Sequence, residues 1–311
     1  MTPLIKELIE GDRLTIQAII GSVSKGVNAT GSPYLNIELR DSSGAINGKK
    51  WEVEAKDEEI FVVGNIVELH IEVLKYRDNL QVKILTAKKI DEDEIDVARF
   101  VMAPPIPKEE LVNRFNKMVD SVKNPDCKAL LDYFIKKYAK KLYEAPAATS
   151  VHHEFASGLI MHSVFMAENC DYIAKQYGSI DRDLLVTGAL LHDFGKMVEL
   201  EGPAVYKYSL EGKLLGHISI MCSEVRKAAE ELNITSEVPM LLEHMILSHH
   251  GKLEFGSPVL PLTKEALILS IVDLLDSKIM VVSKALDTIE PGEFTQKIFH
   301  VDNVCFYKPK K

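Results

Sequence analysis

The sequence predicts a multidomain α and β protein, with an N-terminal five-stranded β-barrel and a C-terminal all-α helical bundle. Its 311 residues suffice for about two domains. The first part alternates apolar and polar side chains in short runs, whereas apolar residues from Lys108 onward recur at helical spacing. An acidic and proline-rich stretch between them is typical of a semi-rigid spacer. We therefore expect a barrel domain, a linker and a helical domain at residues 1–90, 91–107 and 108–311.

Five strands with turn residues between them are expected in the first domain. A short helix at residues 57–61 falls between the third and the fourth strand. Five strands with a helix in this place are the arrangement of an OB-fold. The expected strands span residues 13–24, 34–39, 45–53, 64–73 and 80–85.

An OB-fold barrel offers a surface for single-stranded nucleic acid. Tyr34, Trp51 and Tyr76 are the candidates for stacking on bases. The candidate phosphate partners are basic residues on the same strands, namely Lys49, Lys50, Arg77 and Lys83. Two alternatives remain open here, because the barrel could serve only to pack against a neighbour, and Tyr34 or Trp51 could belong to its core.

The second domain contains seven stretches with helical periodicity. One of them, "KEALILSIVDLLDSKIMVV", is apolar around most of its circumference and yet contains two aspartates. The expected helices span residues 109–122, 126–143, 159–177, 182–192, 218–232, 238–250 and 264–289.

The composition is that of an ordinary soluble protein, with 46% hydrophobic and 27% charged residues. The net charge of −9 argues against indiscriminate coating of nucleic acid but is compatible with a local basic or aromatic groove. The four cysteines form no CxxC pair, which excludes a zinc knuckle and a thioredoxin motif. The first residues lack the apolar core of a signal peptide, and no apolar run approaches the ~20 residues of a membrane helix. We therefore expect a cytoplasmic protein without membrane contact.

Half of the ten histidines fall, with two aspartates, into one ordered series in the helical domain. Neutral imidazoles and carboxylates, one of which can bridge two ions, are the ligands that a two-metal hydrolytic site needs. A single helical histidine is more often a packed or surface side chain, and we assign His70, His152, His244 and His300 to that group. The seven candidate ligands are His162, His192, Asp193, His217, His249, His250 and Asp273.

Two adjacent pairs in this series stand at the expected ends of helices. His192-Asp193 precedes Gly195, and His249-His250 precedes Gly251. A glycine in these places suits the left-handed residue that terminates a helix. Side chains at helix ends can turn toward one pocket, so both pairs are expected to face a shared site.

Asp273 lies inside an apolar helix, where a buried carboxylate is costly unless a cation meets it. Its helical neighbours Ser270 and Ser277 are small. The alternative is that Asp273 pairs with an Arg or Lys or faces water. We assign Asp276, on the same helix, to that alternative.

The "HDFGK" sequence at residues 192–196, with His162 upstream and Asp273 downstream, resembles the HD phosphohydrolase superfamily. His217 and the pair His249-His250 resemble its two-metal branch. The resemblance implies that His162, His192, Asp193 and Asp273 hold one metal ion. It implies that Asp193 bridges to a second ion, which His217, His249 and His250 complete.

Further segments resemble the YhaM-type 3′→5′ exoribonucleases of Gram-positive bacteria, in which an OB-fold precedes such a domain. They are "HHEF" (152–155), "GHISI" (216–220), "SHHGKLEFGSP" (248–258), "PGEFT" (291–295) and "FYKP" (306–309). The resemblance covers nearly the whole chain. It implies hydrolysis of single-stranded RNA from the 3′ end, with weak sequence preference and release of mononucleotides. Single-stranded DNA is a further expected substrate, because the metals act on phosphate.

The expected chemistry is attack of a water activated by two divalent ions, most simply Mn²⁺, with Fe²⁺, Co²⁺ and Zn²⁺ as alternatives. Asp193 would be the least replaceable ligand. Lys196 is the candidate for contact with a phosphate oxygen. The alternative is that its positive charge interacts with the negative end of a helix dipole at a helix C-terminus. By resemblance, His153 and Glu154 are further candidates for substrate contact. A homo-oligomer is left open.

Two other functions compete with the exoribonuclease. The first is a nucleotide or cyclic-nucleotide phosphohydrolase with the same metal set. The barrel argues against it, and the Gly-Tyr-Pro motif of the cyclic-dinucleotide enzymes of this superfamily is absent from the sequence. The second is a non-catalytic RNA-binding protein with a degenerate helical domain, which would be expected to lack ligands.

Overall fold

The computed structural model describes residues 2–27, 31–76, 79–91, 99–100, 106–143, 145, 157–202 and 206–310. The chain divides into two compact units. The first comprises Met1–Ala103 with Gly202–Lys207, and the second comprises Pro104–Glu201 with Tyr208–Lys311.

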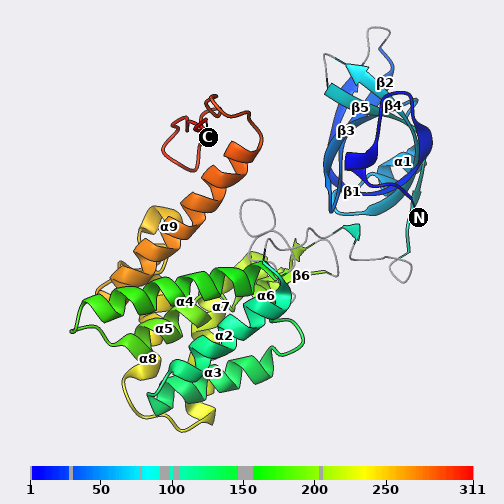
Figure 1. Ribbon diagram of the computed structural model, residues 1–311. Coiled ribbons are helices and arrows are strands. Elements are labelled where there is room, and N and C mark those ends of the chain that lie inside the picture. Colours follow the sequence, from blue (N-terminus) through cyan, green and yellow to red (C-terminus); the bar gives the residue numbers. More distant parts are fainter. Residues whose placement is uncertain are drawn as a thin grey trace. The chain divides into compact units, whose positions relative to one another are not determined.

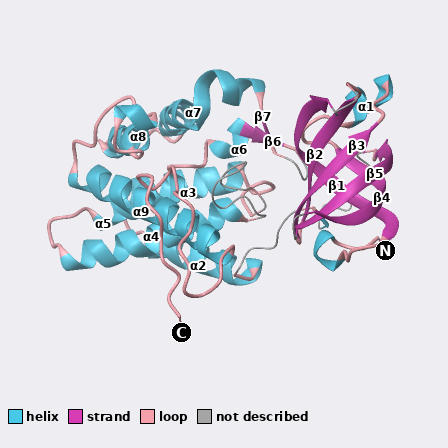
Figure 2. Ribbon diagram, turned by 90° about the horizontal axis from the view of Figure 1, so that it is seen from above, coloured by secondary structure: helices cyan, strands magenta, loops and turns pink. Residues whose placement is uncertain are grey.

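The first unit is a closed barrel of five strands in the order β1-β2-β3-β5-β4 (Figures 1 and 2). Strands β3 and β5 pair in parallel, and the other neighbours are antiparallel. A short helix, α1, connects β3 to β4, and the turn η1 (Ile5–Glu7) precedes β1. These elements are β1 (Arg13–Val27), β2 (Pro33–Asp41), β3 (Gly44–Trp51), α1 (Ala55–Ile60), β4 (Ile66–Tyr76) and β5 (Asn79–Lys89).

The alternation of side chains along the strands forms the interior of the barrel. Ile16, Ile37, Leu39, Leu69 and Ile71 point inward and are fully buried. Every second residue faces outward, as the pleat of a strand requires. The predicted five-stranded barrel with a helix between the third and fourth strands is confirmed, and so is its OB-fold arrangement.

The second unit is a bundle of helices around a single apolar core (Figure 2). Helix α4 packs against α5 and α9, and α7 packs against α8. The helices are α2 (Lys108–Ser121), α3 (Pro125–Lys137), α4 (Gly158–Gln176), α5 (Arg182–Leu191), α6 (Lys196–Glu199), α7 (Leu210–Glu231), α8 (Val238–Ser248) and α9 (Lys264–Asp287), with the turn η4 at Leu253–Phe255. Two-residue strands are β6 (Leu200–Glu201) and β7 (Lys207–Tyr208). Among the described helices, none combines the length and the apolar composition that crossing a bilayer demands.

Three helices differ from the expected ranges. Helix α3 ends at Lys137 because Tyr138 leaves the helical region, although Leu142 beyond it stays buried and continues the apolar spacing. Helix α7 begins at Leu210, where Ser209 caps the N–H of Gly212. The apolar residues of its first turns, Leu210, Leu214 and Leu215, are exposed. They therefore do not form the buried apolar stripe by which a helix is recognised in a sequence. Helix α6 has only four residues, too few to show a period.

Candidate metal centre

The structure brings all seven predicted ligands to one place in the helical unit. They come from the interior of two helices, from the ends of two more, and from a break in a fifth. The ring centroids of neighbouring histidines lie between 4.2 and 5.7 Å apart. The contributing elements are α4 (His162), the end of α5 (His192 and Asp193), α7 (His217), the end of α8 (His249 and His250) and α9 (Asp273).

The turn after α5 is fixed by Phe194. Its ring is fully buried and lies 6.5 Å from Phe115 and 6.4 Å from Tyr138. This packing holds His192 and Asp193 against the core. Gly195 has φ −55°, so the expectation of a left-handed residue was wrong. A Cβ atom there would lie 2.2 Å from the carbonyl oxygen of His217, and glycine is required because the two backbones approach closely.

The second pair follows the expected pattern. Gly251 has φ +76°, in the left-handed region that terminates helices. His249 directs Nδ1 to the carbonyl oxygen of Ile246 at 2.7 Å, and His250 directs Nδ1 to that of Phe255 at 2.8 Å. Both Nδ1 atoms therefore donate to backbone, which leaves both Nε2 atoms as acceptors.

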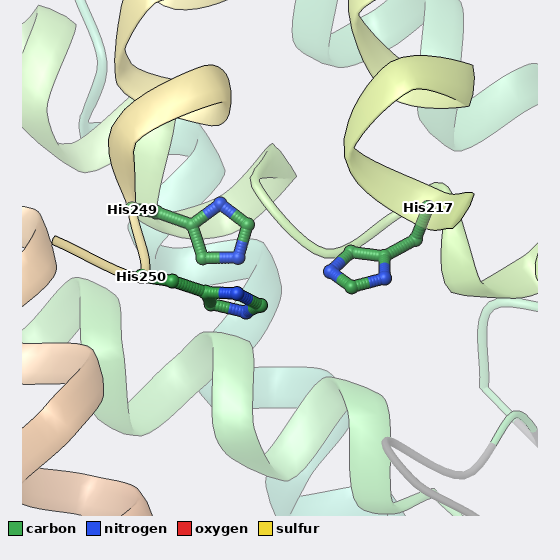
Figure 3. Close-up of side chains that lie close together, drawn as sticks. All are labelled: His217, His249 and His250. Carbon is green, nitrogen blue, oxygen red and sulfur yellow. The ribbon is translucent and has the colours of Figure 1, made fainter. Parts of the chain in front are cut away.

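His217 is positioned by a break in α7. Gly216, with φ +71° and ψ +155°, interrupts the helix immediately before it. The buried carboxylate of Glu199 accepts from the backbone N–H of His217 at 3.1 Å and lies 3.2 Å from its Nδ1. The imidazole is therefore held with Nε2 directed away from Glu199, and Figure 3 shows it facing the pair on α8.

The two carboxylate oxygens of Asp193 face different histidines. Oδ2 lies 3.6 Å from Nε2 of both His162 and His192. Oδ1 lies 3.5 Å from Nε2 of His217 and 3.7 Å from Nε2 of His249. A carboxylate that presents one oxygen to each of two sets of imidazoles has the arrangement of a bridging ligand.

Asp273 and Asp276 both face His162. Oδ1 of Asp273 lies 3.4 Å from Nε2 of His162, and Oδ2 of Asp276 lies 2.7 Å from its Nδ1. The assignment of Asp276 to solvent or to an Arg or Lys partner was wrong, since its carboxylate is buried against the His162 imidazole. Asp276 fixes the ring and leaves Nε2 for the centre, as carboxylates beside metal-binding histidines do.

The residues present fit divalent metal ions. Three of their buried polar atoms have no hydrogen-bond partner among the described residues: Oδ1 of Asp193, Nε2 of His217 and Nε2 of His249. Buried polar atoms are rarely left unpaired, and an ion would satisfy all three. Potential ligand atoms within 4.8 Å of one another form two groups, one of His162, His192 and Asp193 and the other of His217, His249 and His250.

Burial and charge set the protonation of the centre. Burial lowers the pKa of His192 and holds the pKa of His249 well below its usual range, so both imidazoles are neutral. Burial also opposes charge on His162, but the hydrogen bonds to Asp273 and Asp276 raise its pKa to about 10. The pKa of Asp193 lies well below its usual range because Lys196 and the neighbouring imidazoles outweigh its burial.

A cavity of about 750 Å³ opens at the centre. Lys196 lines it and donates to Oδ2 of Asp193 at 2.7 Å. Lys196 is the first residue of α6, and the Asp193 carboxylate accepts from its ammonium. The remaining walls of the cavity include Glu199, Tyr208, Phe255, Ser277, Lys278, Phe299, His300 and Asp302.

The predicted stacking residues of the barrel lie on its outer surface. Tyr34 and Trp51 are cross-strand partners with ring centroids 4.7 Å apart, and the ammonium of Lys49 lies 5.2 and 5.6 Å from them. Neither ring belongs to the described core, so that alternative is excluded. Tyr76 is exposed at the end of β4, and Lys50 is engaged by Asp57 at 3.7 Å. Arg77, His153 and Glu154 lie outside the described residues.

Sequence reasoning missed Glu199, Asp276 and His300. Asp276 follows Asp273 by three residues and therefore shares its helical face, which could have identified it. Glu199 is positioned by the unexpected α6, and His300 is exposed, as expected of a surface histidine, but it also lines the cavity. No pattern in the sequence marks these two.

A helical domain that gathers one His-Asp pair, an upstream histidine and a downstream aspartate around metal-capable atoms defines a metal-dependent HD-domain protein. The HD domain family model matches residues 159–278. The 3′-5′ exoribonuclease YhaM of Geobacillus sp. (strain WCH70) is 42% identical, over 96% of this chain and 93% of that one. The protein of the same name from Bacillus licheniformis is 43% identical, over 96% of each chain. This chain belongs to the family of YhaM 3′-5′ exoribonucleases.

Among solved structures, the second OB-fold domain of replication protein A from Methanococcus maripaludis is similar to part of this chain. The two are 24% identical, and the match covers 30% of this chain and 97% of the replication protein A domain, with a TM-score of 0.26.

Proposed function

We propose that this protein is a metal-dependent 3′→5′ exoribonuclease that hydrolyses the phosphodiester bonds of single-stranded RNA at the centre around Asp193. One observation carries the proposal: the two oxygens of the Asp193 carboxylate face two different sets of imidazoles. Family membership supports the reaction, since the relatives are named for it.

His162, His192, Asp193 and Asp273 would hold one divalent ion, and Asp193, His217, His249 and His250 would hold the second. Bound ions of this kind activate a water molecule and neutralise charge on the phosphate oxygens. We propose that the ion is Mn²⁺. Fe²⁺, Co²⁺ or Zn²⁺ can take its place where that metal is more available.

The protein side chains orient the centre and receive the substrate. Asp276 and Glu199 fix the rings of His162 and His217, so their Nε2 atoms need no reorganisation. Lys196 is partly buried beside Asp193, where its ammonium can neutralise an oxygen of the scissile phosphate. His153 and Glu154 remain proposed substrate contacts.

The barrel would hold the single strand. Tyr34, Trp51 and Lys49 form one outward platform, and Lys83 is the register partner of Lys49 on β5. Aromatic rings stack on any base, and ammonium groups meet phosphates, so this platform suits RNA of any sequence. Tyr76 and Arg77 are further proposed contacts. Neither platform nor ions need the 2′-hydroxyl, and we propose that single-stranded DNA is also accepted.

The proposal is tested with a 5′-labelled single-stranded RNA and Mn²⁺, with and without chelator, beside Asp193→Ala. We expect a ladder of shortening products that disappears with the chelator and with the substitution. Cleavage of free nucleotides or cyclic nucleotides alone would replace this function with that of a nucleotide phosphohydrolase. Binding of RNA without cleavage would indicate a non-catalytic RNA-binding protein.

We further propose that the protein is cytoplasmic and forms a homo-oligomer through α9. Leu267, Ile271, Leu275 and Ile279 recur every four residues on one face of α9, and each is about half exposed. A second copy can cover such a stripe with the same stripe. Light scattering should give a multiple of 34.8 kDa, and Ile271→Glu should give the monomer. A monomeric wild-type protein would contradict this proposal.

A further inference from the structure

The cavity at the metal centre has a second wall that the seven ligands do not explain. It is formed by the second half of α9 and by the segment after it, and includes Lys278, Phe299 and His300. The volume of about 750 Å³ lies within the range of cavities that enclose small-molecule ligands, roughly 300–1,000 Å³. A phosphate group alone would leave most of it empty.

We propose that Phe299 forms a base-stacking subsite beside the metal centre, which receives a nucleobase next to the scissile phosphate. The proposal rests on the nuclease function argued above and adds the residue that holds the end of the strand. Its ligand class is any nucleobase of a single-stranded 3′ end, in RNA or DNA.

The first support is the exposure of the Phe299 ring. The residue is 76% exposed although it lines the cavity, whose walls combine charged and apolar side chains. Its partner is His300, whose ring lies edge-on to it with centroids 5.5 Å apart and an interplanar angle of 84°. An edge contact leaves a face of an aromatic ring available, and that face stacks on a base regardless of sequence.

The second support is that the turn carrying Phe299 is held in place. Ile298 and Val304 form a bridge, and the N–H of Asn303 donates to the carbonyl oxygen of Ile298 at 3.0 Å. Val301, inside the turn, is buried. The turn therefore presents Phe299 from a fixed backbone, which lowers the entropic cost of stacking.

Left-handed residues and an ion pair add to this restraint. Asp302 and Asn303 have φ +53° and +56°, a conformation that Asp and Asn tolerate better than other side chains. The ammonium of Lys278 on α9 lies 3.1 Å from Oδ2 of Asp302. This ion pair places the tip of the turn beside the helix that carries Asp273, on the side of the cavity that Phe299 lines.

The chain contains a matched control. Phe294 is 65% exposed and belongs to the same segment, but it packs on Tyr307 at 5.1 Å and does not line the cavity. Loss of either ring removes a similar apolar area from the surface. Only Phe299 is expected to affect the end of the strand.

The test uses single-stranded RNA with 2-aminopurine at the last or the penultimate position, titrated with the full-length protein in chelator so that no cleavage occurs. The wild type should quench the fluorescence at one of the two positions. Phe299→Ala and Phe299→Leu should abolish the quenching and weaken binding by roughly 5- to 100-fold. Phe299→Trp should restore both, and Phe294→Ala should behave as the wild type.

Absence of quenching in the wild type would overturn the subsite. So would wild-type behaviour of Phe299→Ala, rescue by leucine, or an equal loss in Phe294→Ala. Cleavage with Mn²⁺ is measured in parallel on unmodified RNA. A wild type that cleaves while Phe299→Ala binds normally refutes only the subsite, whereas a wild type that cleaves nothing refutes the nuclease function. Thermal melting of each variant verifies that it is folded.

Discussion

Asp276 accepts a hydrogen bond from His162 across the interface of α9 with α4, with Oδ2 2.7 Å from Nδ1. Because a carboxylate can only accept, this contact places a proton on Nδ1 and turns Nε2 toward His192, at 3.1 Å. This buried pair therefore leaves Nε2 of a proposed ligand for the metal centre and joins α4 to α9.

Replacement of Asp276 by Asn should weaken metal binding without removing a ligand. The amide has the size of the carboxylate but lacks its charge, and the loss of such a partner typically costs 10- to 100-fold in metal affinity. Titration of Mn²⁺ into the metal-free variant measures the change. Asp287→Asn, at the exposed end of the same helix, should match the wild type. An unchanged affinity in Asp276→Asn would show that the contact is only structural.

The order of the ligands could be predicted from the sequence, but the residues that orient them could not. His192, Asp193, His249 and His250 are recognisable because adjacent pairs at helix ends are rare. The role of Asp276 depends on which helix packs against its face, and that depends on the whole bundle. The barrel was predictable for a similar reason, since its alternation is local and its closure follows from five strands in order.

Gly195 shows a different limit. From the sequence, this glycine was expected to form a left-handed turn at the end of a helix. In the structure it is needed because the backbone of His217 comes too close to leave room for a Cβ atom. Close contact between two segments that are remote in the sequence cannot be recognised from the residues of either segment alone.

Substitution of Gly195 by Ala should therefore displace His217. The added Cβ would lie 2.2 Å from the carbonyl oxygen of His217, and neither backbone can move freely. We expect destabilisation by about 1–3 kcal/mol, as for overpacked cores, and a loss of activity beyond it. Thermal melting and RNA cleavage measure the two effects. Gly178→Ala, which meets no atom within 4 Å, is the control. Full activity in Gly195→Ala would contradict this account.

Metal binding should release a proton and weaken in acid. The metal-free pKa of His162 is raised to about 10, so its charged form stabilises the metal-free fold fully below about pH 6.5. That contribution is lost as the pH rises through about 10. A metal ion must displace this proton, so the apparent affinity of the folded protein should rise about tenfold per pH unit below about pH 10. Calorimetry in buffers of different ionisation enthalpy measures the release. Binding without proton release would contradict the assignment of His162.

Replacement of Trp51 by Ala should weaken RNA binding but leave the chemistry intact. Loss of one stacking platform costs roughly 1–3 kcal/mol per base. The KM for a long single strand should rise, whereas hydrolysis of bis(p-nitrophenyl) phosphate should not change. Lower activity on both substrates would mean that the barrel acts on the centre and not on the strand.

The central claim is that the Asp193 carboxylate joins two metal ions. Anomalous diffraction at the manganese edge, from crystals grown with Mn²⁺, tests it most directly. We predict two peaks, one bounded by His162, His192 and Asp273 and the other by His217, His249 and His250, with Asp193 in contact with both. A single peak, or two peaks of which Asp193 contacts only one, would contradict it.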